Sequence, residues 1–184
     1  TILGRFDPVK GHRECFDLWQ DVVKVFGGNI RLHIIGQPEN IKTKDLQSEV
    51  DRRGLSDSVC ITPTRVENIA ELMSSSILGV VPSIGSEIIG RVTEEFLLCG
   101  TPTLVSGVGA LGELIFDHSA GANYGDLKTK EERVALNCRW IDQVRKETSK
   151  DKQERSVRAK TFFSLDAMGK ELDQVIDSLS LPLD

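Results

Sequence analysis

Arg5 and Lys10 are the first residues in the chain whose types and spacing suggest chemistry. Four residues separate Arg5 from Lys10. The pair lies between an apolar run and a segment of helical periodicity that starts at His12. In open α/β sheets, ligands bind at the carboxyl ends of the strands, where such a loop lies. Arginine forks across two oxygens and lysine acts as a point charge, so the pair suits a diphosphate. Two exposed cations without a ligand are the alternative.

A second group of residues with chemical potential lies at 82–95, again after an apolar run. Glu87 falls in a loop, Gly90 stands at the expected start of a helix, and Glu95 lies one or two turns inside it. A glycine there lets a ligand approach free backbone N–H groups, and a helix N-terminus favours anions. Carboxylates beside a phosphate need hydroxyl partners, which a sugar supplies. A capping carboxylate and a solvent-facing one are the alternative.

Gly107, Gly109 and Gly112 have the G-x-G-x-x-G spacing of a dinucleotide-binding loop. Asp126 lies 19 positions after Gly107, near where a ribose-binding acid belongs. However, only about seven residues follow Gly112 before the next break, too few for the crossover helix of a ~30-residue βαβ unit. We therefore interpret this segment as a turn after a late strand, with Glu113 beginning a short helix.

The elements that must position these residues alternate between two periodicities. Short runs of branched apolar residues, the predicted strands, occupy 2–6, 31–35, 58–62, 78–82 and 103–106, with a weak sixth at 122–124. Predicted helices occupy 12–26, 43–53, 66–75 and 165–179, and the chain from residue 127 onward is charge-laced helix. This pattern predicts an α/β fold: a Rossmann-like parallel sheet of about six strands, helices on both faces, and C-terminal helices.

Apolar side chains at helical spacing identify the expected core. In the first helix this face includes Trp19, which we interpret as core, and a later helix has the face Val134, Leu136, Trp140, Ile141 and Val144. The mixed-charge run at 146–160 is expected to be a solvated helix face. The apolar stripe of the helix at 165–179 covers either this domain's own core or another domain.

Bulk composition excludes several functions. A net charge of −5 over 184 residues argues against nucleic acid or an anionic membrane as the main partner. No run approaches the ~20 apolar residues of a membrane span. The cysteines are scattered without C-x-x-C or a Cys/His cluster, which predicts no zinc site and four free, buried thiols in a reducing cytoplasm; they are Cys15, Cys60, Cys99 and Cys138.

The motifs together follow one order along the chain: Gly4-Arg5, Lys10-Gly11, Pro82-Ser83, Glu87, Gly90, Glu95, Cys99-Gly100-Thr101-Pro102, Val108-Gly109 and Glu113. Their order and spacing between Ile2 and Ile115 resemble the C-terminal domain of a GT-B-fold retaining glycosyltransferase of family four, the group 1 glycosyl transferases. The segment after Leu127 resembles the end of that domain only loosely.

The resemblance implies a role for each matching residue. Arg5 and Lys10 would hold the diphosphate of a nucleotide-sugar donor, and Glu95 would contact the ribose. Glu87 would contact hydroxyls of the transferred sugar near its reacting carbon, either as a nucleophile or as an orienting group. With Arg5 and Lys10, Glu87 would form the catalytic set.

Two backbone segments complete the site that the resemblance implies. The N–H groups of Gly90, Arg91 and Val92 would receive phosphate. The loop at Pro63, Thr64 and Arg65 would border the base. Glu94, one position out of register with Glu95, is expected to point elsewhere.

This chain departs from the common family pattern near the donor site. Ile88 and Ile89 stand where Gly-Phe is frequent, Arg91 replaces an aliphatic residue, and Phe96 replaces an alanine. Arg91 either adds a third cation near the phosphates or faces solvent. The bulk of the two isoleucines would reshape the sugar pocket.

The implied function is transfer of a sugar, of the hexosyltransferase type, from a nucleotide-diphosphate sugar to a glycan or lipid-linked glycan with retention, as in polysaccharide biosynthesis. No cofactor or metal is expected, since the chain has no Asp-x-Asp pair. Residues 1–184 would form a single nucleotide-sugar-binding domain in the cytoplasm. An NAD(P)-dependent oxidoreductase using Gly107, Gly109 and Gly112 is one alternative, and a non-catalytic interaction domain of the same fold is another.

The chain starts directly in a strand-like run at Thr1, with no initiator methionine, which indicates a fragment of a longer protein. An N-terminal half is therefore expected to bind the acceptor and to make any membrane contact. Without that half, we expect this chain to be inactive alone.

Overall fold

Six short parallel strands form the centre of the molecule. A computed structural model describes residues 1–85 and 87–179. Two sets of three strands pair in the orders β1-β2-β3 and β4-β5-β6, with Leu3 opposite Ile35 and Val81 opposite Val105. The strands are β1 (Ile2–Leu3), β2 (Leu32–Ile35), β3 (Val59–Thr62), β4 (Gly79–Val81), β5 (Thr103–Val105) and β6 (Gly121–Asn123).

The two sets of strands meet where β1 lies beside β4. The Val80 backbone N–H donates to the Thr1 carbonyl at 2.9 Å, and the Thr1 nitrogen donates to the Leu78 carbonyl at 2.7 Å. The strands therefore follow the spatial order β3-β2-β1-β4-β5-β6. The chain reverses its direction of travel across the sheet between β1 and β4, and ligands of open α/β sheets bind outside the carboxyl ends of the strands at this switch point.

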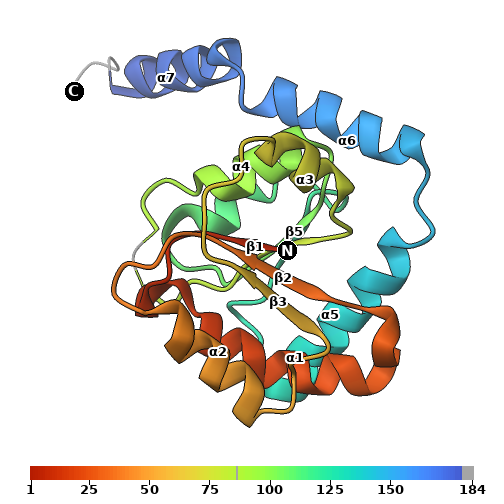
Figure 1. Ribbon diagram of the computed structural model, residues 1–184. Helices are drawn as coiled ribbons and strands as arrows, with labels where there is room; N and C mark the ends of the chain where they lie inside the picture. The colour runs from red at the N-terminus through yellow and green to blue at the C-terminus, as the bar shows by residue number, and fades with distance from the viewer. Residues whose placement is uncertain (86, 180–184) are drawn as a thin grey trace.

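Helices cover both faces of the strands (Figure 1), which confirms the predicted fold class. One face carries α1 (His12–Phe26), α2 (Thr43–Arg52) and α5 (Lys130–Val144), and the other carries α3 (Ile69–Ser75), α4 (Arg91–Leu98) and α6 (Ser149–Phe162). Helix α7 (Leu165–Leu179) projects from the end of α6. The 3₁₀ turns are η1 (Pro8–Lys10), η2 (Gly27–Asn29) and η3 (Gly109–Leu114).

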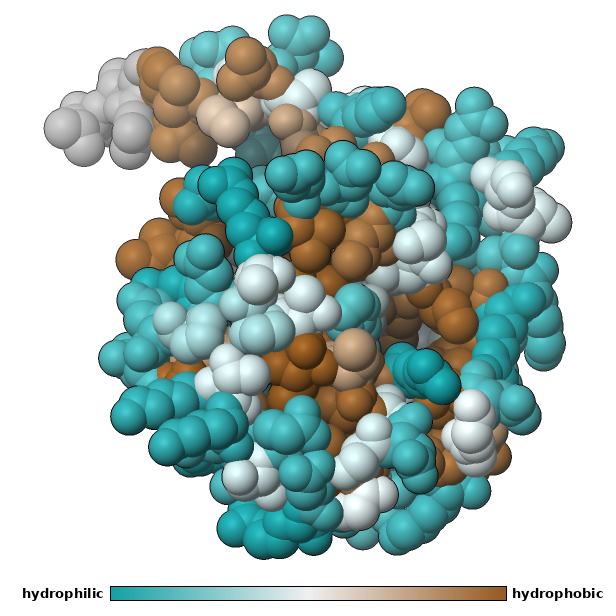
Figure 2. Space-filling view, viewed as in Figure 1, coloured by the Kyte–Doolittle hydropathy of each residue, from teal (hydrophilic) through white to brown (hydrophobic). Residues whose placement is uncertain are grey.

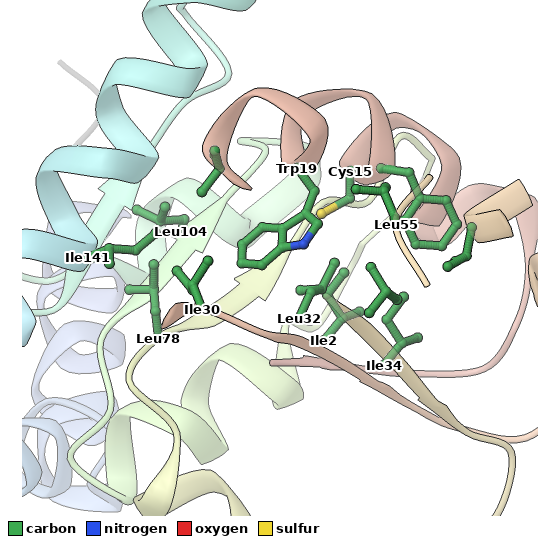
Figure 3. Close-up of a cluster of buried hydrophobic side chains, with 14 of the residues drawn as sticks. Ile2, Cys15, Trp19, Ile30, Leu32, Ile34, Leu55, Leu78, Leu104 and Ile141 are labelled. Carbon is green, nitrogen blue, oxygen red and sulfur yellow. The ribbon is translucent and has the colours of Figure 1, made fainter. Parts of the chain in front are cut away.

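The largest core cluster lies between β1 to β3, α1 and α5 (Figure 3). Helix α1 contributes Cys15, Trp19 and Val22, whose spacing places them on one helix face. Trp19 is buried, as predicted, and its indole N–H donates to the Ser58 hydroxyl at 3.3 Å. The first helix is therefore held on the sheet, which positions the loop that precedes it.

Most of the mixed-charge run at 146–160 lies in α6, and the prediction of a solvated helix face was wrong at Arg155 and Ala159, which are both buried. Arg155 is buried and donates to the carbonyls of Gly100 and Ser119, while pairing with Glu147. A buried guanidinium is tolerated when its donors are satisfied in this way. Arg155 thus ties α6 to the loops that follow α4 and precede β6.

Several predicted boundaries and burials were also wrong. β1 ends at Leu3 instead of residue 6, and α3 begins at Ile69 instead of residue 66. The four cysteines are free, but only Cys15 is buried, and Cys60 is exposed on the edge strand β3. An edge strand lacks a neighbour on one side, so the apolar character of a cysteine does not guarantee its burial there.

The apolar stripe of α7 does not cover the core of this chain. Leu165, Met168, Leu172 and Val175 are each more than half exposed. Figure 2 shows hydrophobic side chains gathered along this projecting helix. Within the described residues, no helix is long and apolar enough to cross a membrane.

Candidate functional site

The loop between β1 and α1 holds Lys10 at the carboxyl end of β1. Asp7 caps the turn η1 by accepting the Val9 backbone N–H at 2.9 Å, and it also accepts the Asn40 amide at 2.6 Å. These hydrogen bonds, that of Val9 first, lower the pKa of Asp7 and keep its carboxylate charged. Proline follows Asp7, which is a turn-starting pattern visible in the sequence. The turn fixes the backbone that carries Lys10.

The same loop lies directly against the loop that follows β4. Gly11 adopts a φ of +67°, and a methyl group there would overlap the carbonyl oxygen of Pro82. The Val9 carbonyl accepts the backbone N–H groups of Ile84 at 2.8 Å and Gly85 at 3.3 Å. The two loops predicted to hold phosphate and sugar are therefore one connected structure.

Lys10 and Glu87 meet at this junction. The Lys10 ammonium pairs with Glu87 Oε1, and the same oxygen accepts the Ser83 hydroxyl at 2.6 Å. Ser83 is buried, and the Lys10 and Glu87 side chains are only 25% and 11% exposed. Lys10 and Glu87, both predicted site residues, are therefore adjacent, and each is the counterion of the other.

Arg5 lies further out on the same edge. Its guanidinium pairs with Glu39 at 2.7 Å, and both side chains are largely exposed, at 62% and 40%. Exposed pairs of this kind contribute little to stability, so Arg5 can exchange its partner at small cost. Nothing in the local sequence marks Glu39 as the partner of Arg5, 34 positions away. Ser83 belongs to the Pro82-Ser83 motif, but that motif does not predict its hydrogen bond to Glu87, four positions away.

A cleft of about 490 Å³ opens at the carboxyl ends of β1 and β4, at the switch point of the sheet. It is lined by Ile2, Leu3, Gly4, Arg5, Lys10, Val80, Val81, Pro82, Ser83, Glu87, Ile89, Gly90, Arg91 and Val92. Six of the predicted site residues therefore share this cleft: Arg5, Lys10, Glu87, Gly90, Arg91 and Val92.

The N-terminus of α4 forms part of the wall of this cleft and has free backbone N–H groups. Gly90 is the N-cap, as predicted, and no side chain in the described part of the chain caps the helix. Within residues 1–85 and 87–179, the backbone N–H groups of Arg91 and Val92 have no hydrogen-bond partner. Uncapped donors and the helix dipole make such an end suitable for an anion.

Glu95 lies outside the lining of the cleft. It follows Arg91 by four positions and Val92 by three, so it lies on the helix face that continues from the cleft wall. Glu95 is exposed and Glu94 half-buried, and neither carboxylate has an ion-pair partner in the described part of the chain. The role of Glu95 stays a prediction.

The loop predicted to border the base reaches a second, shallower hollow of about 320 Å³. Thr64 and Arg65 line this hollow, which shares Leu3, Gly4 and Arg5 with the main cleft. Pro63 is exposed and does not line it. The two hollows together follow the carboxyl edge of the sheet from β3 to β4.

The G-x-G-x-x-G segment does not precede a crossover helix. It forms the short turn η3, which begins at Gly109 and not at Glu113 as predicted. Gly109 has a φ of +59°, a methyl group there would overlap the carbonyl oxygen of Glu87, and the Ala110 N–H donates to that oxygen at 3.0 Å. The glycine turn therefore supports the backbone of Glu87, a role that no spacing rule would reveal.

The departures from the family pattern fall in different environments. Arg91 and Ile89 both line the cleft, Arg91 without an ion-pair partner in the described residues, while Ile88 is 83% exposed. Phe96 is fully buried, and its ring packs against Gly79. Glycine on β4 thus provides the room that the larger side chain needs.

His12 begins α1, as predicted, but contributes no positive charge to the cleft. It is buried, with its ring edge-on to that of Phe6 at 5.8 Å. Burial lowers the pKa of His12 to about 4, so the imidazole is neutral near pH 7. In the described residues, no cluster of histidine, cysteine or carboxylate side chains could hold a metal ion.

Residues 1–136 match the family model of the glycosyl transferases group 1. The chain belongs to this family. Among curated relatives of this group 1 glycosyl transferase chain, a D-inositol 3-phosphate glycosyltransferase of Rhodococcus erythropolis is 29% identical over 141 residues, covering 74% of this chain and 32% of the relative. An uncharacterized glycosyltransferase of Methanocaldococcus jannaschii is 31% identical over 134 residues, covering 70% and 36%. The chain spans about a third of the length of these relatives.

Two solved structures illustrate the fold that this group 1 chain shares with known proteins. Anabaena Alr3699/HepE in complex with UDP has a TM-score of 0.69 at 21% identity, covering 96% of this chain and 48% of that one. The C-terminal domain of a group 1 protein, LpcC, from Francisella tularensis has a TM-score of 0.68 at 18% identity, covering 89% and 85%. These likenesses confirm the fold expected for the C-terminal half of a GT-B glycosyltransferase.

Proposed function

We propose that this domain binds a nucleotide-diphosphate sugar in the cleft between β1 and β4 and supplies the donor half of a retaining glycosyl transfer. The observation that carries the proposal is the junction of Lys10 and Glu87 beside the uncapped N-terminus of α4, at the switch point of the sheet. A cation, a helix N-terminus and a carboxylate match the three parts of such a ligand that lie near the broken bond: two phosphates and a sugar.

The diphosphate would be held by charge from two sides. Arg5, Lys10 and Arg91 line the cleft, and the free N–H groups of Arg91 and Val92 face it from α4. In glycosyl transfer the bond between the sugar and the diphosphate breaks, and negative charge develops on the leaving phosphate. Donors that are already in place stabilise that charge without having to reorganise. The proposal therefore assigns this charge stabilisation to the protein's own donors and no step to a metal or cofactor.

The transferred sugar would lie beside Glu87, whose carboxylate accepts sugar hydroxyls. The ribose would extend along α4 to Glu95, and the base would lie in the hollow bordered by Thr64 and Arg65. Because HepE has been solved in complex with UDP and with UDP and glucose, UDP is the first nucleotide to test. The acceptor, a glycan or lipid-linked glycan, would be bound by a further half of the protein, and this chain alone would bind donor without transferring it.

Thermal unfolding of the chain with UDP, GDP, ADP and NAD tests the proposed function. We expect one nucleoside diphosphate to raise the Tm by roughly 5–11 °C at a concentration one hundred times its Kd, because a ligand that binds only the folded state stabilises it. NAD should produce no comparable shift. Stabilisation by NAD alone would favour the oxidoreductase interpretation, and no shift with any ligand would contradict donor binding.

Glu95→Gln is expected to lower the affinity for the nucleoside diphosphate by about 5- to 20-fold, since an amide accepts ribose hydroxyls less strongly than a carboxylate does. Glu94→Gln is the matched control, because it removes the same charge from the neighbouring position of α4. Isothermal titration calorimetry measures both. Equal losses in the two variants would exclude a specific ribose contact at Glu95.

A further inference from the structure

We propose that Glu87 is an internal competitor for the donor diphosphate. In the free protein its carboxylate neutralises Lys10, and binding of an intact donor transfers Lys10 to the phosphates while the sugar hydroxyls replace Lys10 at Glu87. The site then selects a nucleotide sugar over the free nucleoside diphosphate. This inference rests on the proposed function and adds the way in which donor and product are distinguished.

The hydrogen bonds of Glu87 are divided unequally between its two oxygens. Oε1 accepts both the Lys10 ammonium and the Ser83 hydroxyl, whereas Oε2 has no partner among the described residues. A carboxylate has about four acceptor sites. Oε2 can therefore accept a sugar hydroxyl while Lys10 is still present, whereas Oε1, which already accepts two donors, can accept a hydroxyl only after Lys10 has left.

The geometry indicates which member of the pair moves. The Glu87 carbonyl is held by the Ala110 N–H, and the loop before it is held by the Val9 carbonyl through Ile84 and Gly85. The buried Ser83 hydroxyl also donates to the Glu87 carboxylate. Lys10 has a flexible four-carbon side chain with three donors, and a quarter of it is exposed to the cleft. Lys10 is therefore the partner that turns toward a phosphate.

The exchange has an energetic consequence that depends on the sugar. When a nucleoside diphosphate without a sugar takes Lys10, the Glu87 carboxylate is left mostly buried with Ser83 as its donor, beside new negative charge. An under-satisfied buried charge is costly, and like charges repel. Hydroxyls of an attached sugar remove this cost by donating to Glu87. After transfer, the return of Lys10 to Glu87 favours release of the product.

The Arg5 and Glu39 pair provides an internal comparison. It also neutralises a cation of the cleft, but both side chains are exposed, and among residues 1–85 and 87–179 Glu39 has no second side-chain donor comparable to Ser83. Solvent screens such pairs, so their rupture costs little. Competition between the carboxylate and the donor phosphates for a cation should therefore be marked at Glu87 and small at Glu39.

A double-mutant cycle tests the inference, with UDP, GDP and ADP and their glucose conjugates as probes in calorimetric titrations. Glu87→Gln keeps the shape of the side chain and its bond from Ser83 but removes the charge that holds Lys10. For the diphosphate that binds, we expect this variant to have about fivefold higher affinity than the wild type. In a Lys10→Ala background the same substitution should raise affinity by a clearly smaller factor, about twofold or less, because it relieves only the repulsion between Glu87 and the phosphates and no cation is left to release.

The preference for the sugar conjugate over the free diphosphate should fall in Glu87→Gln, and Glu39→Gln should change neither affinity by more than about twofold. Equal gains in both Lys10 backgrounds would mean simple charge removal and would overturn the inference, while wild-type binding would still support the proposed function. An unchanged conjugate preference would also overturn the inference. Binding of no probe by wild type or variant would overturn both proposals.

Discussion

Lys10→Ala is expected to weaken binding of the nucleoside diphosphate by about 30-fold or more, or ~2 kcal/mol, the loss typical of a charge-assisted contact in a partly buried site. Lys10 lines the cleft at the carboxyl end of β1, and turn η1 and Gly11 fix its backbone. The substitution removes the cation and leaves Glu87 facing the phosphates, so both changes act in the same direction.

Calorimetric titration of the nucleotide identified by thermal unfolding measures this loss. Lys170→Ala, which removes the same charge from an exposed position on α7, is the control and should bind as the wild type does. Affinity of the wild type should also fall with added salt, and less steeply in Lys10→Ala, because screening acts on the charge that the variant lacks. Unchanged affinity in a folded Lys10→Ala chain would place the phosphates elsewhere.

Gly109→Ala is expected to lower the affinity for a nucleotide sugar by about tenfold and the free energy of unfolding by roughly 1–3 kcal/mol. The residue has a φ of +59°, which favours glycine, and its added methyl group would overlap the carbonyl oxygen of Glu87. The backbone of Glu87 must then move, which carries its carboxylate away from Lys10 and Ser83.

Gly54→Ala separates backbone strain from this displacement. Gly54 also has a positive φ, of +66°, but a methyl group there would meet no atom within 4 Å. We expect Gly54→Ala to lower stability by ~1 kcal/mol and to leave ligand affinity unchanged. Chemical denaturation and calorimetric titration of both variants measure the two quantities. A Gly109→Ala chain with wild-type affinity would show that η3 does not position Glu87.

Most elements of the fold could be predicted from local pattern. Helix α1 occupies the predicted residues 12–26 and α7 the predicted 165–179, because apolar side chains recur at helical spacing in both and glycine follows the first. All six strands lie within one residue of the predicted positions except at the end of β1. There Phe6 pairs only through an isolated bridge to Pro38, since the loop turns toward its cap at Asp7.

Predictions that depended on burial were less successful. Arg155 and Cys60 have the burials opposite to those expected from residue type. A guanidinium can be buried when carbonyls from distant loops accept its donors, and an edge strand leaves an apolar residue exposed. Neither circumstance is encoded within a few positions of the residue concerned.

The sequence by itself determined the strands and helices, the family, and the identity of Arg5, Lys10 and Glu87 as candidate site residues. Only the tertiary structure decided that Lys10 and Glu87 neutralise each other, that Ser83 holds the same oxygen, and that the glycine turn at 107–112 supports the backbone of Glu87. The physical reason is the separation along the chain of the residues that interact. Periodicity and turn chemistry act over a few residues, whereas Lys10 and Glu87 are 77 positions apart and meet because the switch point brings the loops after β1 and β4 together.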